Sequence, residues 1–186
     1  MVPACTEALT AALPTAAVVD HTLALPFAIG VAEPAAVGAD RWCNVAAAVA
    51  RGWRDALVVD AGTATTFDLL VGGCFVGGLI APGMAFAARR LGEAAARLVP
   101  VPFAACPLVA GATTAAAMQA GAFHVGVRGV LGVIEGLLAR YGARPVVVTG
   151  GLAAHLARPG WLHDPDWTLR GALTLALPRQ DGVSAD

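Results

Sequence analysis

Short apolar runs separated by glycine-rich turns occupy the middle of the chain. Runs of strand length lie at residues 56–59, 66–71 and 75–80, and the turns between them contain Gly62 and the pair Gly72-Gly73. Runs of this length, joined by turns of a few residues, predict an antiparallel meander of three strands. We therefore expect a β-sheet at the centre of the chain.

Helical spacing of the apolar residues predicts several helices around this meander. Pro82 suits the first turn of a helix that continues to residue 98, because the first turn leaves its N–H groups unpaired. The other expected helices span residues 6–13, 39–51, 114–140 and 168–177, and one more follows Gly151 and ends at residue 158. Further strands are expected at 16–19 and 145–148, an extended segment at 23–31 and a loop at 34–38. The chain is thus predicted to be an α/β protein.

Composition indicates a folded and unusually apolar chain. Of the 186 residues, 58% are hydrophobic and 13% are charged, and the formal net charge is −1. A surface with so little charge favours contact with a partner subunit. The 12 basic residues are all arginines and are dispersed, so the chain has no basic block that could neutralise a run of DNA or RNA phosphates. Nucleic-acid binding is therefore not expected.

Several kinds of chemistry are excluded by residue types or spacings that the chain lacks. It has no lysine, which excludes a GxxxxGK[ST] phosphate loop and a Schiff-base mechanism. The four cysteines have no CxxC spacing, and the four histidines form no HxxxH or HExxH pattern, so neither a zinc site nor a disulfide framework is expected. Free buried thiols, and a start without the pattern of a signal peptide, predict a cytoplasmic protein.

Two apolar stretches, residues 69–88 and 98–127, contain no Asp, Glu or Arg. Glycine pairs interrupt the first stretch and prolines interrupt the second, whereas a helix that spans a membrane needs about 20 uninterrupted apolar residues. Both stretches are therefore expected to be buried, soluble structure, with no membrane segment.

The segment DAGTATTFD, residues 60–68, concentrates polar groups between two expected strands. Gly62 lets the backbone approach a ligand closely, and the N–H groups of such a turn, with the hydroxyls of its three threonines, suit phosphate oxygens. Asp60 at the strand end could bind a cation that accompanies the phosphate. An ordinary Asp-Gly hairpin turn explains the same pattern without a ligand.

Five motifs together resemble the type III pantothenate kinase family. They are Gly38-Ala-Asp-Arg41 with Asn44 one turn later, the DAGTATTFD segment, Gly77-Gly-Leu-Ile-Ala-Pro-Gly83, Thr113-Thr114 with Ala117-Met118 and Gly121, and Thr149-Gly-Gly-Leu-Ala153. The motifs follow the order of the family, and the likeness extends over almost the whole chain.

The order of three strands, helix, strand and helix resembles a half-domain of the ribonuclease-H-like fold, which actin, sugar kinases and heat-shock ATPases share. Two such halves normally enclose a nucleotide. Residues 53–186 are expected to form one complete half-domain. Residues 1–52 are expected to be a remnant of the first half-domain with a linker helix.

The resemblance implies that the chain transfers the γ-phosphoryl group of ATP to the primary hydroxyl of pantothenate, which is the first step of coenzyme A synthesis. Magnesium and a monovalent cation, potassium or ammonium, are the implied cofactors. Members of the family are homodimers that bind the substrate near the interface, so a homodimer is expected.

The resemblance also implies roles for individual residues. Asp40 would accept the proton of the attacking hydroxyl, as a carboxylate can, and Asp60 would bind the monovalent cation. The residues implied to bind pantothenate are Gly38, Ala39, Asp40, Arg41 and Thr114. Those implied to bind the nucleotide are Gly62, Thr63, Thr149, Gly150 and Gly151.

Structural explanations stay open at the same positions. Asp40 could be a cap or first-turn acid of a helix, Arg41 a solvated surface residue and Thr114 an ordinary helix N-cap. The glycines after Thr149 could serve a tight turn alone.

Complete relatives begin with a strand and a DxGNT loop that grips the ATP phosphates, and no such element follows Met1. Whether Met1 is the true start is left open. Loss of this loop would remove hydrogen bonds that matter most in the transition state. The alternative is therefore a catalytically impaired homologue that acts as a binding or regulatory protein, such as an accessory factor in transcription.

Overall fold

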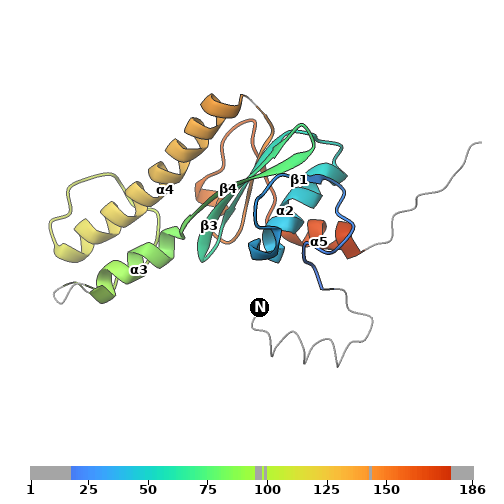
Figure 1. Cartoon of the computed structure of the whole chain (residues 1–186). Helices are drawn as coiled ribbons and strands as arrows, with labels where there is room; N and C mark the ends of the chain where they lie inside the picture. The colour runs from blue at the N-terminus through green and yellow to red at the C-terminus, as the bar shows by residue number, and fades with distance from the viewer. Residues whose placement is uncertain (1–17, 95–97, 99, 143, 177–186) are drawn as a thin grey trace, which may run out of the picture.

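The computed structural model describes residues 18–94, 98, 100–142 and 144–176. In this part of the chain, six strands form one sheet in the order β1-β4-β3-β2-β5-β6 (Figure 1). The strands are β1 (Ala28–Ile29), β2 (Ala56–Ala61), β3 (Ala64–Val71), β4 (Cys74–Pro82), β5 (Val146–Thr149) and β6 (Leu162–His163). The antiparallel meander of β2, β3 and β4 is confirmed. β5 runs parallel to β2, β6 runs parallel to β5, and β1 runs parallel to β4.

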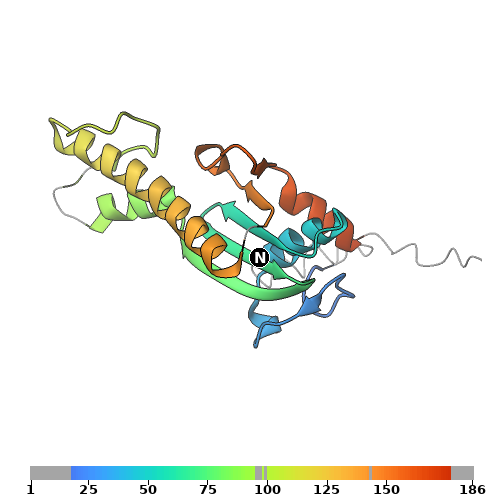
Figure 2. The same ribbon diagram turned by 90° about the horizontal axis from the view of Figure 1, so that it is seen from above.

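Helices cover both faces of the sheet (Figures 1 and 2). They are α2 (Ala39–Ala50), α3 (Met84–Ala94), α4 (Thr114–Tyr141) and α5 (Trp167–Ala176), with short 3-10 helices η1 (Pro34–Ala36) and η2 (Ala153–His155). α2 and α5 pack against each other on one face, and the C-terminal part of α4 packs on the other. α3 lies beside α4, and the two helices project together away from the sheet in Figure 1.

The sheet separates two hydrophobic cores. The core beneath α4 includes Leu57, Val59, Phe67, Leu69, Val130 and Ile134. The core beneath α2 and α5 includes Trp42, Val58, Leu70, Phe75 and Trp167. Successive side chains of a strand point to opposite faces, so residues two apart share a face. Val58 and Leu70 lie in the core beneath α2. Asp60 and Asp68 are each two residues from one of them and therefore lie on the face that α2 covers.

Two expected helices differ in the structure, and one strand was not expected. Pro82 ends β4, paired with Ala64, and α3 begins only at Met84, because β3 and β4 are both longer than their apolar runs. After Thr149 the chain forms the single turn η2 rather than a helix to residue 158, and the two-residue strand β6 follows. The glycine pair and Pro159 leave too few residues there for a helix of several turns.

Most of the remaining expectations are confirmed for the elements that the structure describes, although the loop expected at 34–38 contains the 3-10 helix η1. The helices predicted at 39–51, 114–140 and 168–177 correspond to α2, α4 and α5, and the extended segment at 23–31 contains β1. The helix at 6–13 and residues 16 and 17 of the expected strand lie outside the described residues, and residues 18 and 19 are not in a strand.

α4 is the one helix in the described part of the chain that is long and apolar enough to cross a membrane. Its most apolar 18-residue window has a mean hydropathy of 1.5, and 17% of that window is buried. The expectation that residues 98–127 are buried therefore holds only in part. Met118 and Val127 are buried, whereas Leu108, Val109 and Val125 are exposed.

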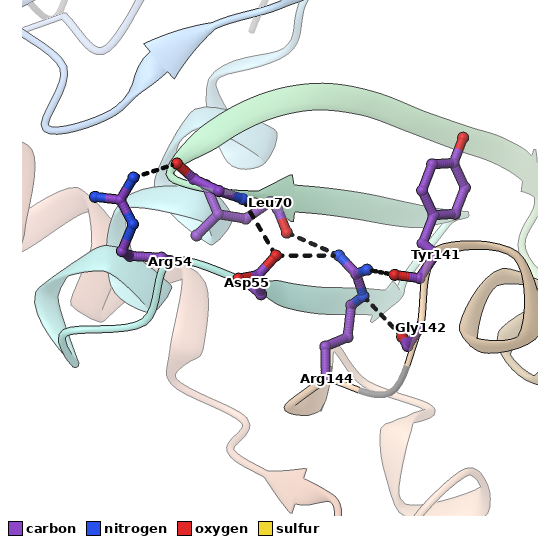
Figure 3. Close-up of polar contacts among 7 residues, drawn as sticks. Arg54, Asp55, Leu70, Tyr141, Gly142 and Arg144 are labelled. Atoms are coloured by element: carbon purple, nitrogen blue, oxygen red, sulfur yellow. Dashed lines mark hydrogen bonds and ion pairs between the residues drawn. The ribbon is translucent and has the colours of Figure 1, made fainter.

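Arg144 joins the end of α4 to the sheet (Figure 3). Its guanidinium donates to the carbonyl oxygens of Tyr141 and Gly142 at the helix end, and to that of Leu70 on β3 at 3.1 Å. The same group lies 3.7 Å from a carboxylate oxygen of Asp55, and the Arg144 side chain is 4% exposed. These contacts satisfy carbonyls that a helix end leaves unpaired.

Candidate functional site

Two glycine-containing turns enclose the carboxyl end of β2. Asp60 lies there opposite Thr149 of the parallel strand β5. The first turn is closed by the Gly62 N–H, which donates to the Ala64 carbonyl at 3.0 Å. In the second turn Gly150 has a φ of +88°, and a Cβ at this position would collide with Oδ1 of Asp60. Conformation and close packing therefore both require glycine at residue 150.

The segment after β4 reaches the same end of the sheet. The Gly83 N–H donates to the Thr63 carbonyl at 3.0 Å, and a Cβ on Gly83 would collide with the carbonyls of Gly62 and Thr63. The Leu152 N–H donates to the Ala61 carbonyl at 3.1 Å. The turns after β2, β4 and β5 are thus held together by backbone hydrogen bonds.

A cleft of about 410 Å³ opens where these turns meet. It is lined by Ala61, Gly62, Thr63, Ala85, Phe86, Arg89, Gly151 and Leu152. Its volume lies within the range of about 300–1,000 Å³ that is usual for small-molecule sites. Gly62, Thr63 and Gly151, which the resemblance implied for the nucleotide, line this cleft, whereas Phe86 and Arg89 were not foreseen.

The first turn of α2 carries Asp40. Gly38 is the N-cap residue in an extended conformation, and its carbonyl accepts from the Arg41 N–H at 3.1 Å. A Cβ on Gly38 would lie 2.5 Å from Oδ1 of Asp40, so the carboxylate folds back over Gly38. Asp40 is therefore a first-turn acid of α2 and not its N-cap residue.

Asp40 and Asp60 share one electrostatic environment. Burial raises the pKa of Asp60, the negative charge of Asp40 raises it further, and a hydrogen bond from Asn44 lowers it. The pKa of the Cys43 thiol rises to about 11, mainly through burial and then through Asp40. Interactions between charges fall off with distance. The start of α2, which carries Asp40, and the end of β2, which carries Asp60, therefore lie close to each other.

Asp68 is a fully buried carboxylate at the base of this region. Arg41 Nε donates to Oδ1 of Asp68 at 2.5 Å, while Asn44 Nδ2 and Thr66 Oγ1 donate to Oδ2 at 3.4 and 3.3 Å. Burial raises the pKa of Asp68 to about 6, whereas Arg41 and Asn44 lower it and Asp40 raises it. This carboxylate connects α2 to β3.

Asn44 is held in a single orientation. Its Oδ1 accepts from Thr168 Oγ1 at 2.8 Å, so its amide nitrogen is left to face the carboxylates. Its backbone carbonyl accepts from Trp167 Nε1 at 3.0 Å. α5 therefore fixes the side chain that donates to Asp68.

Arg41 is not the solvated surface residue that the sequence left open. Its side chain is 12% exposed, and its Cζ lies 5.4 Å from the centroid of the Phe75 ring. Nη2 is buried without a hydrogen-bond partner among the described residues, and a Cβ on Gly78 would lie 3.2 Å from it. Arg41 thus has one nitrogen committed to Asp68 and one that no acceptor among the described residues satisfies.

The three threonines of the DAGTATTFD segment do not share one role. Thr63 is exposed and lines the cleft, whereas Thr65 and Thr66 are buried. Thr66 donates to Asp68, and the Thr65 hydroxyl has no partner among the described residues. The expectation that all three hydroxyls face a phosphate is therefore wrong for Thr65 and Thr66.

Thr114 lies far from the carboxylates. It is the exposed first residue of α4, at the end of the helix that projects from the sheet (Figure 1). The N-cap is Thr113, whose Oγ1 accepts from the Ala116 N–H at 3.2 Å. Thr114 is therefore not the cap, and within one chain it does not meet Asp40.

Within the described ranges, no three His, Cys, Asp or Glu side chains are grouped so that they could hold a metal ion. A cation at Asp60 would therefore depend on one carboxylate together with backbone, water or phosphate oxygens. Oxygen donors of this kind suit hard cations such as potassium and magnesium.

The family model and the most similar curated proteins agree on one family. The family model described as type III pantothenate kinase matches residues 2–140. The type III pantothenate kinase of Acidiphilium cryptum is 42% identical over 161 residues, which cover 81% of this chain and 59% of that protein. The enzyme of the same name from Thermomicrobium roseum is 41% identical, covering 69% of this chain and 51% of that protein.

A solved structure from Campylobacter jejuni, described as a Baf family transcriptional activator, is also similar. It is 28% identical with a TM-score of 0.50, over 75% of this chain and 63% of that chain. The chain thus spans between half and two thirds of the length of the relatives that it matches.

Proposed function

We propose that this chain, which belongs to the type III pantothenate kinase family, phosphorylates pantothenate with ATP as the donor. The observation that carries this proposal is the Asp60 carboxylate, which lies against Gly62 of the cleft and against Gly150, with Asp40 close enough to raise its pKa. Phosphoryl transfer depends mainly on alignment and electrostatic stabilisation, and it needs an acceptor for the hydroxyl proton. The site offers groups for each of these tasks.

Asp40 is the proposed proton acceptor. The hydroxyl oxygen of pantothenate forms a bond to the γ-phosphorus, the bond from that phosphorus to the β-phosphate oxygen breaks, and ADP leaves. The hydroxyl proton passes to the Asp40 carboxylate. The position of Asp40 in the first turn of a helix that is buried on one side supports this role, because rigid elements hold a base in place.

Gly38, Ala39 and Arg41 are the proposed contacts of pantothenate beside Asp40. Gly38 leaves room for a ligand to approach the backbone. Nη2 of Arg41 has no partner in the described part of the chain, which supports a polar contact with the substrate, since a buried donor without a partner costs free energy. The Asp68 carboxylate would hold this guanidinium in place while it binds.

The turns around the cleft are the proposed nucleotide site. Gly62 and Thr63 would contact phosphates, and Thr149, Gly150 and Gly151 would hold the adenosine side. Thr149 is buried and Gly150 packs on Asp60, so these two residues would act by shaping the turn.

Asp60 is the proposed ligand of a potassium or ammonium ion, which would neutralise part of the phosphate charge. Its half-buried carboxylate lies between the two turns and fits a hard or hydrogen-bonding cation. Magnesium would enter with ATP, because this ion is usually held by substrate phosphates and few protein groups.

A homodimer is the proposed assembly. A groove of about 420 Å³ between α3 and α4 is lined almost entirely by apolar residues, and Leu91 and Val125 at its sides are exposed. Contact with a second copy would cover this surface. Thr114 would then contact pantothenate near the interface, since within one chain it lies away from Asp40.

The strand order supports a ribonuclease-H-like half-domain as the finer description of the fold, because an antiparallel meander is followed by parallel strands on one side. The division into residues 1–52 and 53–186 is part of the same proposal. The scattered arginines favour neither nucleic acid nor a membrane surface as partner, and a coenzyme A enzyme would act in the cytoplasm.

A coupled assay of ATP turnover tests this function. The 186-residue chain is supplied with pantothenate, magnesium and potassium, and ADP formation is followed. We expect turnover that depends on pantothenate. A folded chain that forms no ADP under these conditions would contradict the kinase function and favour the regulatory alternative.

A further inference from the structure

α3 supplies one wall of the cleft, although no motif drew attention to this helix. Its residues Ala85, Phe86 and Arg89 face the cleft together with Gly62 and Gly151 from the two turns. α3 is placed there by the hydrogen bond from the Gly83 N–H to the turn after β2. A nucleotide in this cleft would therefore touch α3.

We propose that Arg89 binds a phosphate group of the nucleotide and that Phe86 packs against its adenosine part. This inference rests on the proposed binding of ATP and extends it to two residues outside the five motifs. It assigns α3 to recognition of the ligand.

Arg89 is the charged residue among those that line the cleft. ATP carries several negative charges, and the neighbouring turns offer it hydroxyl and backbone donors only. A guanidinium supplies charge-assisted hydrogen bonds in a planar arrangement that matches phosphate oxygens. The chain has no lysine to take this role.

The guanidinium of Arg89 is available to a ligand. Its side chain is 59% exposed, and Nε lies 3.7 Å from Oε1 of Glu93. An exposed ion pair at this distance contributes little free energy, so Arg89 can leave Glu93 to bind a ligand at little cost. Arg90 holds the same carboxylate more closely, with Nη1 at 2.7 Å from Oε2.

Phe86 is the aromatic residue of the lining, and its ring is half-buried. The Cζ atoms of Arg89 and Arg90 lie 5.6 and 5.2 Å from the ring centroid, so both guanidinium groups contact the ring and only the position of Arg89 in the cleft lining separates them. Leu152 lines the cleft from the turn after β5. A flat base between Phe86 and Leu152 would be enclosed by apolar groups, as in most nucleotide pockets.

The test measures binding of MgATP and of adenosine to the full chain by titration calorimetry. Arg89→Gln removes the charge, Phe86→Leu removes the aromatic face, and Arg90→Gln is the matched control. Arg90 lies next to Arg89 on α3 and has a similar exposure of 61%, but it does not line the cleft. Melting curves by circular dichroism check that each variant is folded.

We expect Arg89→Gln to weaken MgATP binding by about tenfold, the usual effect of a lost charge-assisted hydrogen bond, and to leave adenosine binding unchanged. Phe86→Leu should weaken both ligands by about three- to tenfold. Arg90→Gln should stay within about twofold of the wild type for both ligands.

Equal losses in Arg89→Gln and Arg90→Gln would overturn the inference, because the effect would then come from net charge. A wild-type chain that binds no MgATP would overturn both this inference and the proposed nucleotide site. Binding that depends on Arg89, without phosphorylation of pantothenate, would support the inference and contradict the proposed kinase activity.

Discussion

Asp68 and Arg41 form an ion pair inside the protein, with 2.5 Å between Oδ1 of Asp68 and Nε of Arg41. Asp68 belongs to β3 and is fully buried, and Arg41 belongs to the first turn of α2. The pair therefore fixes the turn that carries Asp40 on the sheet.

This buried carboxylate predicts a dependence of stability on pH. Burial raises the pKa of Asp68 from 3.8 to about 6, despite Arg41. Between about pH 4 and pH 6 the folded protein keeps a proton that the unfolded chain releases. The free energy of unfolding should therefore fall as the pH rises through this window, by on the order of 3 kcal/mol, and then level off.

Urea denaturation of the wild type and of Asp68→Asn, at several pH values from 4 to 7, checks this prediction. The variant lacks the titrating group, so the stability of the wild type relative to the variant should decrease with pH. A difference that stays constant over this range would show that Asp68 does not bind a proton in the folded state near pH 5.

Gly150→Ala is predicted to destabilise the protein by at least about 1 kcal/mol. The substitution places a Cβ against Oδ1 of Asp60 and forces alanine to adopt a φ of +88°. Gly151→Ala is the matched control, because no atom lies within 4 Å of the added Cβ. Equal melting temperatures for the two variants would contradict the described packing of Gly150 on Asp60.

Potassium is predicted to stabilise the protein through Asp60. The melting temperature should be higher in potassium chloride than in tetramethylammonium chloride at the same ionic strength, because binding to the folded state stabilises it. Asp60→Asn should remove this difference, and Asp166→Asn, at an exposed residue, should retain it. A potassium effect that survives in Asp60→Asn would place the cation elsewhere.

Arg144→Ala is predicted to lower the free energy of unfolding by about 2–4 kcal/mol, because it leaves carbonyl oxygens of α4 and β3 without their donor. Arg140→Ala removes an exposed arginine from the same helix and should change it by less than about 0.5 kcal/mol. Denaturation in urea measures both. Similar losses in the two variants would mean that the contacts in Figure 3 add no stability.

Local signals in the sequence predicted most of the fold. The meander followed from short apolar runs between glycines, and α2 and α4 followed from apolar residues at helical spacing. β6 was missed because two residues carry no periodic signal. Pro82 was misplaced because proline suits a helix start, whereas the pairing of β4 with β3 continues to that residue.

The candidate site was predicted less completely, because its members meet only through the fold. Asp60 and Asp68 were visible as the ends of one motif, but it is the register of β2 with β3, in which Asp60 is opposite Thr66, that places both on the same face of the sheet. Packing between distant segments places α2 over this face. The same packing brings Arg41 and Asn44 to Asp68. No short motif marks Phe86 or Arg89, which enter the cleft because of where α3 begins.

The direct test of the account is transfer of labelled phosphate from ATP to pantothenate. The chain is incubated with γ-³²P-ATP, pantothenate, magnesium and potassium, and the radioactivity in the pantothenate fraction is measured for the wild type and for Asp40→Asn. We predict labelled phosphopantothenate from the wild type, and a rate about 10²- to 10⁴-fold lower for a folded Asp40→Asn, because the proton acceptor is lost. Equal rates in the two proteins would contradict the role of Asp40 as proton acceptor. A folded wild type that leaves no label in pantothenate would contradict the kinase activity itself.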